Sequence, residues 1–394
     1  MPLQPPPTRA RDEASVATAL RRLKDGAGSH APSVAEVERA LPGAVQVDAC
    51  FLANPYATDE VMRRLRAIPA DRLERMVAGY PSQGGAVASA LAPYVGVPAD
   101  HLQPANGACE VIGALVSRAP GPLLLCVPTF SAYYEFAAGL VIPHALHPRD
   151  DFRLDLEALE AKVDRYAPET VVIITPNNPD GGLVDRSALI GFVERVRGRV
   201  RQVIVDESFG AFAGEVPPAS LAPLVTELAH LVVVNSLSKS HGIAGLRLGY
   251  AAMSRARAQE LRRGSLWNLN AFAEWFCDLL GDDGYLVAYE DARRRYVRDA
   301  RRLFAGLGAL PGVRAFPTAA NFALLEVGRP AHEVATALLA RHGVYVRDCA
   351  DKWGLEGDRF LRVAARTDAE NRRILFALSD VLSHPAWPRF AAAA

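Results

Sequence analysis

Residues 236–250 read Ser-Leu-Ser-Lys-Ser-His-Gly-Ile-Ala-Gly-Leu-Arg-Leu-Gly-Tyr, and this stretch indicates both the fold and the chemistry. It follows an apolar run at 231–235 that is typical of a short buried strand, so Lys239 lies just beyond the carboxyl end of a strand. A primary amine can form a Schiff base with an aldehyde, whereas a guanidinium cannot. The alternative is a lysine that only caps a turn. Among the 44 basic residues, the lysines are Lys24, Lys162, Lys239 and Lys352.

Short apolar strands alternate with helical patterns before and after this stretch, which predicts an α/β fold. Continuous apolar strands separated by helices favour a mainly parallel sheet that helices cover on both faces. The expected strands are 123–127, 171–175, 203–206, 231–235 and 248–252, and the expected helices include 13–24, 59–76, 86–94, 155–166 and 185–197.

The pattern changes near residue 284 and predicts a smaller α+β domain after the large one. We expect an N-terminal arm at 1–45 that is loose at its start and contributes to the small domain, a large domain at 46–284 and a small domain at 285–394. The elements expected after residue 284 are helices at 285–307, 331–342 and 368–382 and strands at 321–327 and 360–364.

Composition excludes several classes of partner. Lys plus Arg equals Asp plus Glu, so no net positive charge favours nucleic acid or an anionic membrane. No apolar run reaches transmembrane length, and the N-terminus lacks a secretory apolar segment. The five cysteines form neither a metal-ligand spacing nor a disulfide framework, so we expect no metal and a cytoplasmic protein with reduced thiols.

Polar and aromatic residues follow several of the expected strands, where open α/β sheets bind ligands. Residues 106–110 (Asn-Gly-Ala-Cys-Glu) open a helix whose free N–H groups would attract an anion, although they could be a simple N-cap. Phe130 follows one strand and could stack on a ligand or pack in the core. Asn178 lies in a strand-ending turn. Asp206 ends another strand, where backbone donors satisfy a carboxylate unless a cation needs it.

One kind of ligand would use all of these groups: a phosphorylated aromatic aldehyde with a basic ring nitrogen. Lys239 would form the Schiff base, and Asp206 would keep the ring nitrogen protonated so that the ring acts as an electron sink. Phe130 would stack on the ring and Asn178 would donate to its oxygen. The phosphate would bind at the helix start with Ser236, Ser238 and Arg247.

The order of these motifs resembles the class I/II aminotransferases of the pyridoxal-phosphate-dependent fold type I. Within that family, the chain is most similar to the histidinol-phosphate aminotransferases and the threonine-phosphate decarboxylases. The shared motifs are Asn54-Pro-Tyr56, Tyr80-Pro81, Asn106-Gly-x-x-Glu110, Pro128-Thr-Phe130, Pro176-Asn-Asn-Pro-x-Gly181, Asp206-Glu-x-Phe209, residues 236–250 and Arg362-x-Ala-x-Arg-Thr367.

The resemblance implies pyridoxal 5'-phosphate as the cofactor and Lys239 as the Schiff-base lysine and proton shuttle. Tyr80 matches a tyrosine that reaches the phosphate from the partner subunit, which implies a homodimer with shared active sites. The other cofactor contacts it implies are Gly107, Ala108, Cys109, Phe130, Asn178, Asp206, Phe209, Ser236, Ser238 and Arg247.

The resemblance also implies a small amino-acid substrate. Arg362 matches the arginine that binds the α-carboxylate, and Tyr56 belongs to the substrate side. Arg347 matches an arginine that binds a substrate phosphate, with a surface arginine as the alternative.

Three departures bear on the reaction. Phe209 stands where the transaminases usually have Tyr, whereas the decarboxylase-like members tolerate Phe. Asp180 and Cys109 replace a usual Thr and a usual Asp. We expect an aminotransferase acting on an amino acid that could be phosphorylated. The alternative is a decarboxylase or lyase on the same fold, for which a role in secondary-metabolite biosynthesis is one option.

Two other classes fit the sequence less well. A nicotinamide dehydrogenase should show G-x-G-x-x-G after its first strand, and this chain has no such run. A transcriptional regulator built on the same fold would need a DNA-binding domain, and the first fifty residues are too short and not basic.

Overall fold

The computed structural model describes residues 11–263 and 269–383, which form two compact units. The large unit comprises Ala53–Asn178 and Gly182–Arg295, and the small unit comprises the chain up to Leu52, Pro179–Gly181 and the chain from Tyr296. The boundary between the two units falls between Arg295 and Tyr296, within α13 (Asp283–Gly308). The domain boundaries expected at residues 46 and 285 stay a prediction.

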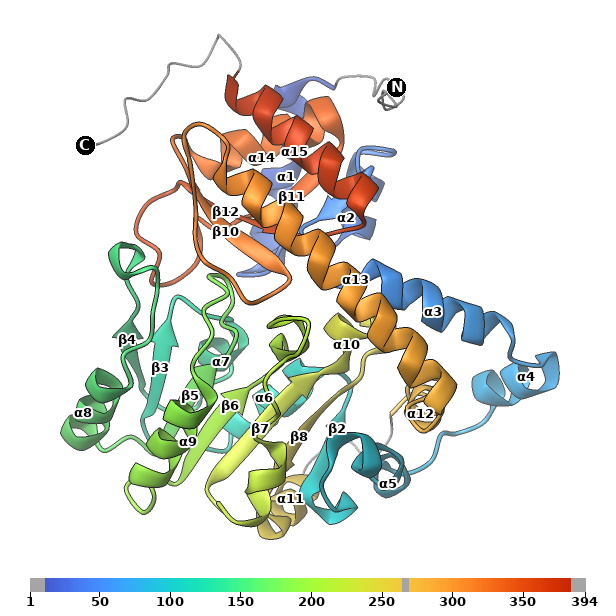
Figure 1. The fold of residues 1–394 in the computed structure, drawn as a ribbon, viewed down its shortest axis with the longest axis vertical. Helices are drawn as coiled ribbons and strands as arrows, with labels where there is room; N and C mark the ends of the chain where they lie inside the picture. The colour runs from blue at the N-terminus through green and yellow to red at the C-terminus, as the bar shows by residue number, and fades with distance from the viewer. Residues whose placement is uncertain (1–10, 264–268, 384–394) are drawn as a thin grey trace. The chain divides into compact units, whose positions relative to one another are not determined.

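A seven-stranded sheet forms the centre of the large unit (Figure 1). The strands β4, β3, β5, β6 and β7 run parallel to one another, and β8 joins antiparallel between β7 and β2. A mainly parallel sheet in an α/β fold is therefore confirmed. The strands are β2 (Leu102–Ala105), β3 (Leu123–Val127), β4 (Val141–Ala145), β5 (Thr170–Ile174), β6 (Gln202–Asp206), β7 (Leu231–Ser236) and β8 (Gly249–Met253).

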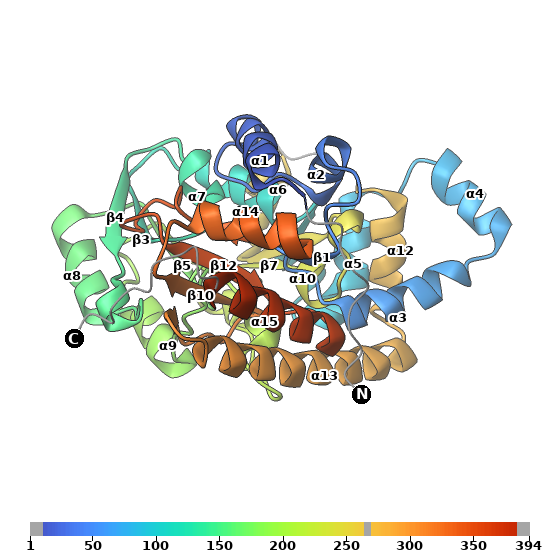
Figure 2. The same ribbon diagram turned by 90° about the horizontal axis from the view of Figure 1, so that it is seen from above.

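Helices lie on both faces of this sheet. α8 and α9 cover one face, and α6 and α7 lie on the other (Figures 1 and 2). The α-helices of this unit are α3 (Pro55–Arg66), α4 (Ala70–Ala78), α5 (Gly84–Val95), α6 (Ala108–Val116), α7 (Ala132–Glu135), α8 (Leu156–Tyr166), α9 (Arg186–Arg195), α10 (Leu237–Ser240), α11 (Arg255–Arg262) and α12 (Ala271–Leu279). Short 3₁₀ helices are η1 (Ala99–His101), η2 (Pro148–Asp150), η3 (Gly210–Phe212), η4 (Ala222–Thr226) and η5 (Ala244–Leu246).

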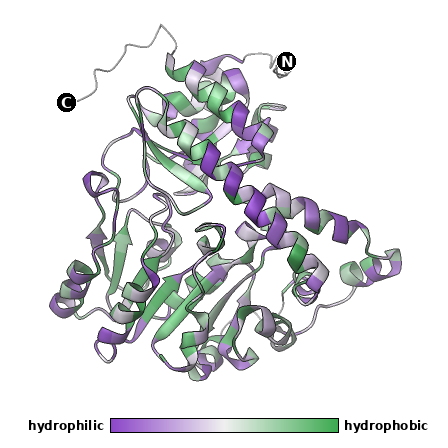
Figure 3. Ribbon diagram, viewed as in Figure 1, coloured by the Kyte–Doolittle hydropathy of each residue, from purple (hydrophilic) through white to green (hydrophobic). Residues whose placement is uncertain are grey.

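The core of the large unit follows from the apolar strand runs. Every residue of β3, β5, β6 and β8 is buried. Figure 3 shows these strands as predominantly hydrophobic. Because helices cover both faces, the strands are apolar at consecutive positions and do not alternate with polar residues.

The small unit is built on a five-stranded sheet with the order β1-β11-β12-β10-β9. β1 pairs with β11 in parallel, and the other pairs are antiparallel. α14 packs against β11, and α1 packs against α14. Its elements are α1 (Glu13–Ala27), α2 (Val34–Ala40), β1 (Val47–Ala49), β9 (Val313–Ala315), β10 (Phe322–Val327), α14 (Ala331–His342), β11 (Val344–Asp348), β12 (Phe360–Ala364) and α15 (Asp368–Ser383).

Two expectations for the first eighty residues are corrected. The helix expected at 13–24 is confirmed as α1, but this part of the arm is not loose, because Val16 is fully buried in an apolar cluster with Val37 and Leu339. Residues 1–10 of that arm lie outside the described residues. The single helix expected at 59–76 is two helices, because Pro69 cannot donate a helical hydrogen bond and instead precedes α4 as its N-cap. No helix in the described part of the chain is long and apolar enough to cross a membrane.

Candidate active site

Lys239 lies in the short helix α10, directly after β7. The N-terminus of α3 holds the backbone of this turn. The carbonyl of Lys239 accepts from the N–H of Asn54 at 3.0 Å, and the amide of Asn54 donates to the carbonyl of Ser240 at 3.3 Å. The hydroxyl of Thr58 donates to the carbonyl of Gly242 at 2.8 Å. Gly242 has φ 66°, and a Cβ there would meet Asn54 and Thr58, so the turn fits only glycine at this position.

Asp206 ends β6 and pairs in register with Val234 of the neighbouring β7. Its Oδ2 accepts from the hydroxyl of Tyr133 at 2.9 Å, and its Oδ1 accepts from the N–H of Ser208 at 2.9 Å. Burial raises the pKa of this carboxyl, and the two hydrogen bonds and the charge of Lys239 oppose that rise. A buried carboxylate with these donors can hold a cationic N–H close by.

The N-terminus of α6 and the guanidinium of Arg247 form a candidate anion site. Gly107 is the N-cap of α6 with φ 86°, and a Cβ on it would collide with the guanidinium of Arg247. Arg247 therefore lies directly against this helix start, where free N–H groups and the helix dipole also favour an anion. Ser236 and Ser238, on the same turn as Lys239, are both buried.

Cys109 connects these groups electrostatically. Burial raises the pKa of its thiol, and the charges of Lys239 and Arg247 lower it while that of Asp206 raises it. The amine of Lys239, the guanidinium of Arg247 and the carboxylate of Asp206 therefore all lie close enough to Cys109 to act on the pKa of its thiol. Ala108 lies beside Cys109 in the first turn of α6.

The three residues expected around the cofactor ring also lie beyond strand ends of the large unit. Phe130 follows β3 and packs beside the core, Asn178 is buried after β5, and Phe209 is buried before η3. Asn177 holds two of these turns together, because its amide donates to Pro128 at 2.9 Å and accepts from Thr129 at 3.0 Å.

Pyridoxal 5'-phosphate fits this donor set. An amine, a buried carboxylate and an anion site at a helix start are the groups that its aldehyde, ring nitrogen and phosphate require. When bound, the cofactor supplies an electron sink for charge that develops on the substrate. The roles of the individual residues stay predictions.

The sequence reasoning missed two groups near Lys239. Tyr133 lies three residues after Phe130, outside the strand-ending motif, and its hydrogen bond to Asp206 at 2.9 Å connects it with the site. His241 is fully buried, with its ring nitrogens 2.9 Å from the hydroxyl of Tyr94 and 2.8 Å from that of Tyr285. Burial lowers the pKa of His241 to about 3, so the ring is neutral and acts as a structural link behind the lysine turn.

Two predicted residues of the large unit, Tyr80 and Tyr56, have surroundings other than the groups described above. Tyr80 is 100% exposed in the loop between α4 and α5. The ring of Tyr56, in the first turn of α3, lies under the guanidinium of Arg295 at 4.4 Å. Neither observation assigns a ligand to these tyrosines.

The predicted substrate arginines belong to the small unit, where they face each other in the sheet. Arg347 of β11 is directly opposite Arg362 of β12. Their exposed fractions are 5% and 8%, so the alternative that Arg347 is a surface arginine is wrong. Arg347 donates to both carboxylate oxygens of Asp351, at 2.7 and 2.9 Å, and to the carbonyl of Ser29 at 2.8 Å. Arg362 donates to the carbonyl of Cys50 at 2.9 Å.

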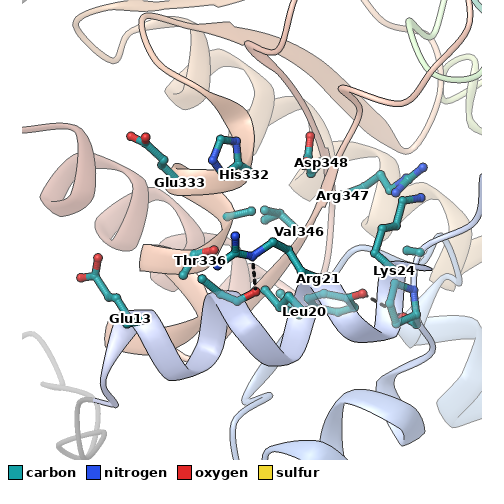
Figure 4. Close-up of a pocket in the computed structure, with 16 residues that line it drawn as sticks. Glu13, Leu20, Arg21, Lys24, His332, Glu333, Thr336, Val346, Arg347 and Asp348 are labelled. Atoms are coloured by element: carbon teal, nitrogen blue, oxygen red, sulfur yellow. Dashed lines mark hydrogen bonds between the residues drawn. The ribbon is translucent and has the colours of Figure 1, made fainter. Parts of the chain in front are cut away.

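Arg347 also lines a cavity of about 500 Å³ between α1, α14 and β11. Figure 4 shows Lys24 and Arg347 together at one side of this cavity, with Glu13 and Glu333 at the other. Charges of both signs line the cavity, because Asp348 lies beside Arg347 and Arg21 lies near the middle, and apolar residues such as Leu20 lie among them (Figure 4).

Comparison with known proteins identifies the family. Residues 51–378 match the model of the family "Aminotransferase class I and II". An L-serine phosphate decarboxylase of Campylobacter jejuni is 34% identical over 381 residues, which cover 94% of this chain and 97% of that relative. A solved decarboxylase from Sulfurospirillum multivorans has a TM-score of 0.88 at 34% identity, covering 94% of this chain and 97% of the other. A histidinol-phosphate aminotransferase of Caldanaerobacter subterraneus is 30% identical over 300 residues, 74% of this chain and 81% of that relative. The chain therefore belongs to the class I and II aminotransferase family and is a pyridoxal-phosphate-dependent enzyme of fold type I.

Proposed function

We propose that this enzyme decarboxylates an O-phosphorylated amino acid and that O-phospho-L-serine is the first substrate to test. The observation that carries the proposal is the similarity to an L-serine phosphate decarboxylase along nearly the whole of both chains. The solved decarboxylase of Sulfurospirillum multivorans supports the same reaction type. These relatives favour the alternative that the sequence left open over the aminotransferase that we expected first.

The charges of the small unit support a substrate with two anionic groups. Arg347 and Arg362 are buried opposite each other, although like charges at directly opposed positions destabilise a sheet. A substrate with a carboxylate and a phosphate would offset this repulsion. Phe209, which the decarboxylase-like members of the family tolerate, is compatible with that reaction.

The reaction replaces a carboxylate by a proton. The bond between Cα and the carboxylate breaks, carbon dioxide leaves, and Cα takes up one proton to give O-phosphoethanolamine. In our proposal Lys239 carries that proton to Cα, and Asp206 stabilises positive charge at the ring nitrogen. Arg362 and Arg347 orient the two anionic groups of the substrate.

An aminotransferase is the second candidate. The name of the family and the similarity to a histidinol-phosphate aminotransferase favour it. It would use the same Lys239 and Asp206 but remove a proton from Cα instead of carbon dioxide. The two candidates therefore differ in which substrate bond breaks.

We also propose that the enzyme is a cytoplasmic homodimer with shared active sites. A fully exposed Tyr80 on a loop supports this, because a tyrosine at the matching position of the family reaches the partner's cofactor. The measurement is the mass of the holoenzyme in solution by light scattering. A monomer that is fully active at the same concentration would contradict the dimer.

The test of the reaction is an incubation of holoenzyme with O-phospho-L-serine in the absence of any keto acid. We expect continuous release of carbon dioxide and one O-phosphoethanolamine for each carbon dioxide. L-Serine serves as the substrate without a phosphate, and L-histidinol phosphate with 2-oxoglutarate tests amino-group transfer. Formation of glutamate without carbon dioxide would overturn the decarboxylase and establish the aminotransferase.

A further inference from the structure

A third buried cation lies beside the two arginines of the small unit. Lys352 stands in the turn that connects β11 and β12, where its N–H donates to the carbonyl of Cys349 at 3.0 Å. It is only 5% exposed. The charges of Arg347 and Arg362 both lower the pKa of Lys352, so the three cations lie close together. We call Arg347, Lys352 and Arg362 the cation cluster.

The two arginines of this cluster already have protein acceptors. Asp351 accepts two hydrogen bonds from Arg347 and also pairs with Lys24 of α1. Arg362 donates to the carbonyl of Cys50, and its guanidinium lies 5.3 Å from the centre of the Phe322 ring.

Lys352 differs from them. Across residues 11–263 and 269–383, the ion pairs include none between Lys352 and a carboxylate. Burial and the charges of Arg347 and Arg362 lower the pKa of this lysine to about 8. A buried ammonium is unfavourable unless an anion or several acceptors compensate it. Acidic residues also lie near the two arginines, since Asp48 acts on the pKa of Arg362 and Arg347 acts on that of Asp348. In the described residues none of these acids forms an ion pair with Lys352, so its charge has no directly paired carboxylate.

The chemistry of the side chain indicates which anion it takes. Only four of the 44 basic residues in the chain are lysines, and Lys24 and Lys352 both belong to this region. An ammonium is a compact point charge with three donors and binds phosphate, as a guanidinium also does, so Lys352 and Arg347 can bind one phosphate together. Arg362 matches the family's carboxylate-binding arginine, which leaves Arg347 and Lys352 for the phosphate.

We propose that Lys352 determines specificity for the phosphorylated substrate by binding its phosphate, with Arg347 beside it and Asp351 as the competing carboxylate. The identity of the substrate rests on the proposed function, but the phosphate site itself does not. The alternative is that Lys352 only packs its aliphatic stem in the turn.

The test is calorimetric binding of O-phospho-L-serine and of inorganic phosphate to the holoenzyme and to the variant Lys352→Met, which keeps the stem but not the charge. We expect both dissociation constants to rise roughly 10- to 100-fold, as is typical for a lost charged hydrogen bond. Lys352→Arg should recover most of the affinity. Lys162→Met is the matched control, because this exposed lysine of α8 in the large unit donates only to the carbonyl of Pro143 at 2.8 Å.

A second variant keeps the test decisive if Lys352→Met does not fold. Asp351→Asn removes the acid that competes for Arg347, so it should tighten binding of inorganic phosphate several-fold. Thermal unfolding and the visible absorbance of the cofactor verify that each variant is intact. Unchanged affinity of Lys352→Met, or weaker phosphate binding by Asp351→Asn, would overturn the inference.

The outcomes separate this inference from the proposed function. If no carbon dioxide forms but phosphate binding depends on Lys352, the site stands and the reaction is reassigned. If O-phospho-L-serine is decarboxylated and Lys352→Met binds it as tightly as wild type, the reaction stands and Lys352 is structural.

Discussion

The lysine turn of the large unit and the cation cluster of the small unit are built in opposite ways. Around Lys239, the backbone carbonyls of the turn accept hydrogen bonds from Asn54 and Thr58. Around Lys352, Asp351 pairs with Arg347 and Lys24, and no ion pair in the described residues joins a carboxylate to Lys352 itself. In our proposal the hydrogen-bonded turn holds one amine in place for covalent chemistry. The buried cation without a paired carboxylate instead favours binding of an anionic substrate.

The comparison predicts separate effects on rate and on affinity. Changes at the lysine turn or at Asp206 should lower kcat, because these groups act on the reacting atoms or position them. Changes in the cation cluster should act first on the KM of phosphorylated substrates. A variant in one region that altered only the parameter assigned to the other would break the comparison.

The largest effect is expected for Lys239→Ala. In our proposal Lys239 holds the cofactor and moves the proton, so removal of its amine should lower kcat by on the order of 10⁴-fold or more. The visible absorbance and the adduct trapped with borohydride should disappear together. Lys162→Ala, on the exposed face of α8, is the control. Turnover above one hundredth of wild type in Lys239→Ala would exclude the assigned role.

The next effect is expected for Asp206→Ala and Asp206→Asn. The carboxylate should be needed for the electron sink and less for holding the cofactor, so kcat should fall by roughly 10²- to 10³-fold with the cofactor retained. Tyr133→Phe removes one donor to this carboxylate and should cost less. Steady-state rates and the cofactor content after dialysis measure the two effects. An Asp206→Asn variant with full activity would make the carboxylate structural.

The sequence predicted the parts of the fold that rest on local patterns. β3 was expected at its observed bounds, because five consecutive apolar residues are bordered by Pro and Gly on one side and Pro on the other. β1, β2 and β11 were not predicted. They are short and pair with strands distant in the sequence, and in β2 the polar Gln103 and the ring of Pro104 are buried despite the absence of an apolar run.

Site residues could be predicted where they belong to local sequence motifs. They could not be predicted where their role depends on contacts between residues distant in the sequence. Lys239, Asp206 and Gly107 follow strands or open a helix, and those signals are local. The hydrogen bond between Tyr133 and Asp206 joins residues 73 positions apart, so no local pattern indicates it. Lys352 belongs to no motif, and only the burial of its turn beside two arginines distinguishes it.

A smaller effect is expected in the pH dependence of substrate binding. Lys352 is charged below its pKa of about 8 and loses that charge as the pH rises through it. The KM for O-phospho-L-serine should therefore increase above pH 8, by up to roughly 10-fold, since a substrate phosphate with a second pKa near ~6 stays doubly charged there. Lys352→Arg, which cannot lose its charge, should show a flatter profile.

The KM of wild type divided by the KM of Lys352→Arg at each pH separates the titration of Lys352 from the titrations of other groups. Arg347 and Arg362 stay charged, and the pKa of Asp351 is lowered by Arg347 and Lys24 despite its partial burial, so Asp351 stays ionised. The remaining neighbour is Cys349, whose thiol has its pKa raised by burial and is neutral. Titration of the substrate amine is the same for both enzymes and cancels. Parallel profiles would show that Lys352 does not bind the phosphate.

The smallest effect is expected for Thr58→Val, which tests whether the paired turn positions the lysine. The change keeps the shape of the side chain but removes the hydroxyl that donates to Gly242 at 2.8 Å. Loss of one such bond should lower the free energy of unfolding by about 1 kcal/mol. We expect kcat to fall a few-fold, because the backbone around Lys239 gains freedom, and KM to stay constant, because the cation cluster belongs to the small unit. Thr18→Val is the matched control, since Thr18 lies on the exposed face of α1 and its hydroxyl donates to the carbonyl of Ala14 at 2.8 Å. If Thr58→Val raised KM and left kcat unchanged, the turn would contribute to substrate affinity and the separation of the two regions would fail.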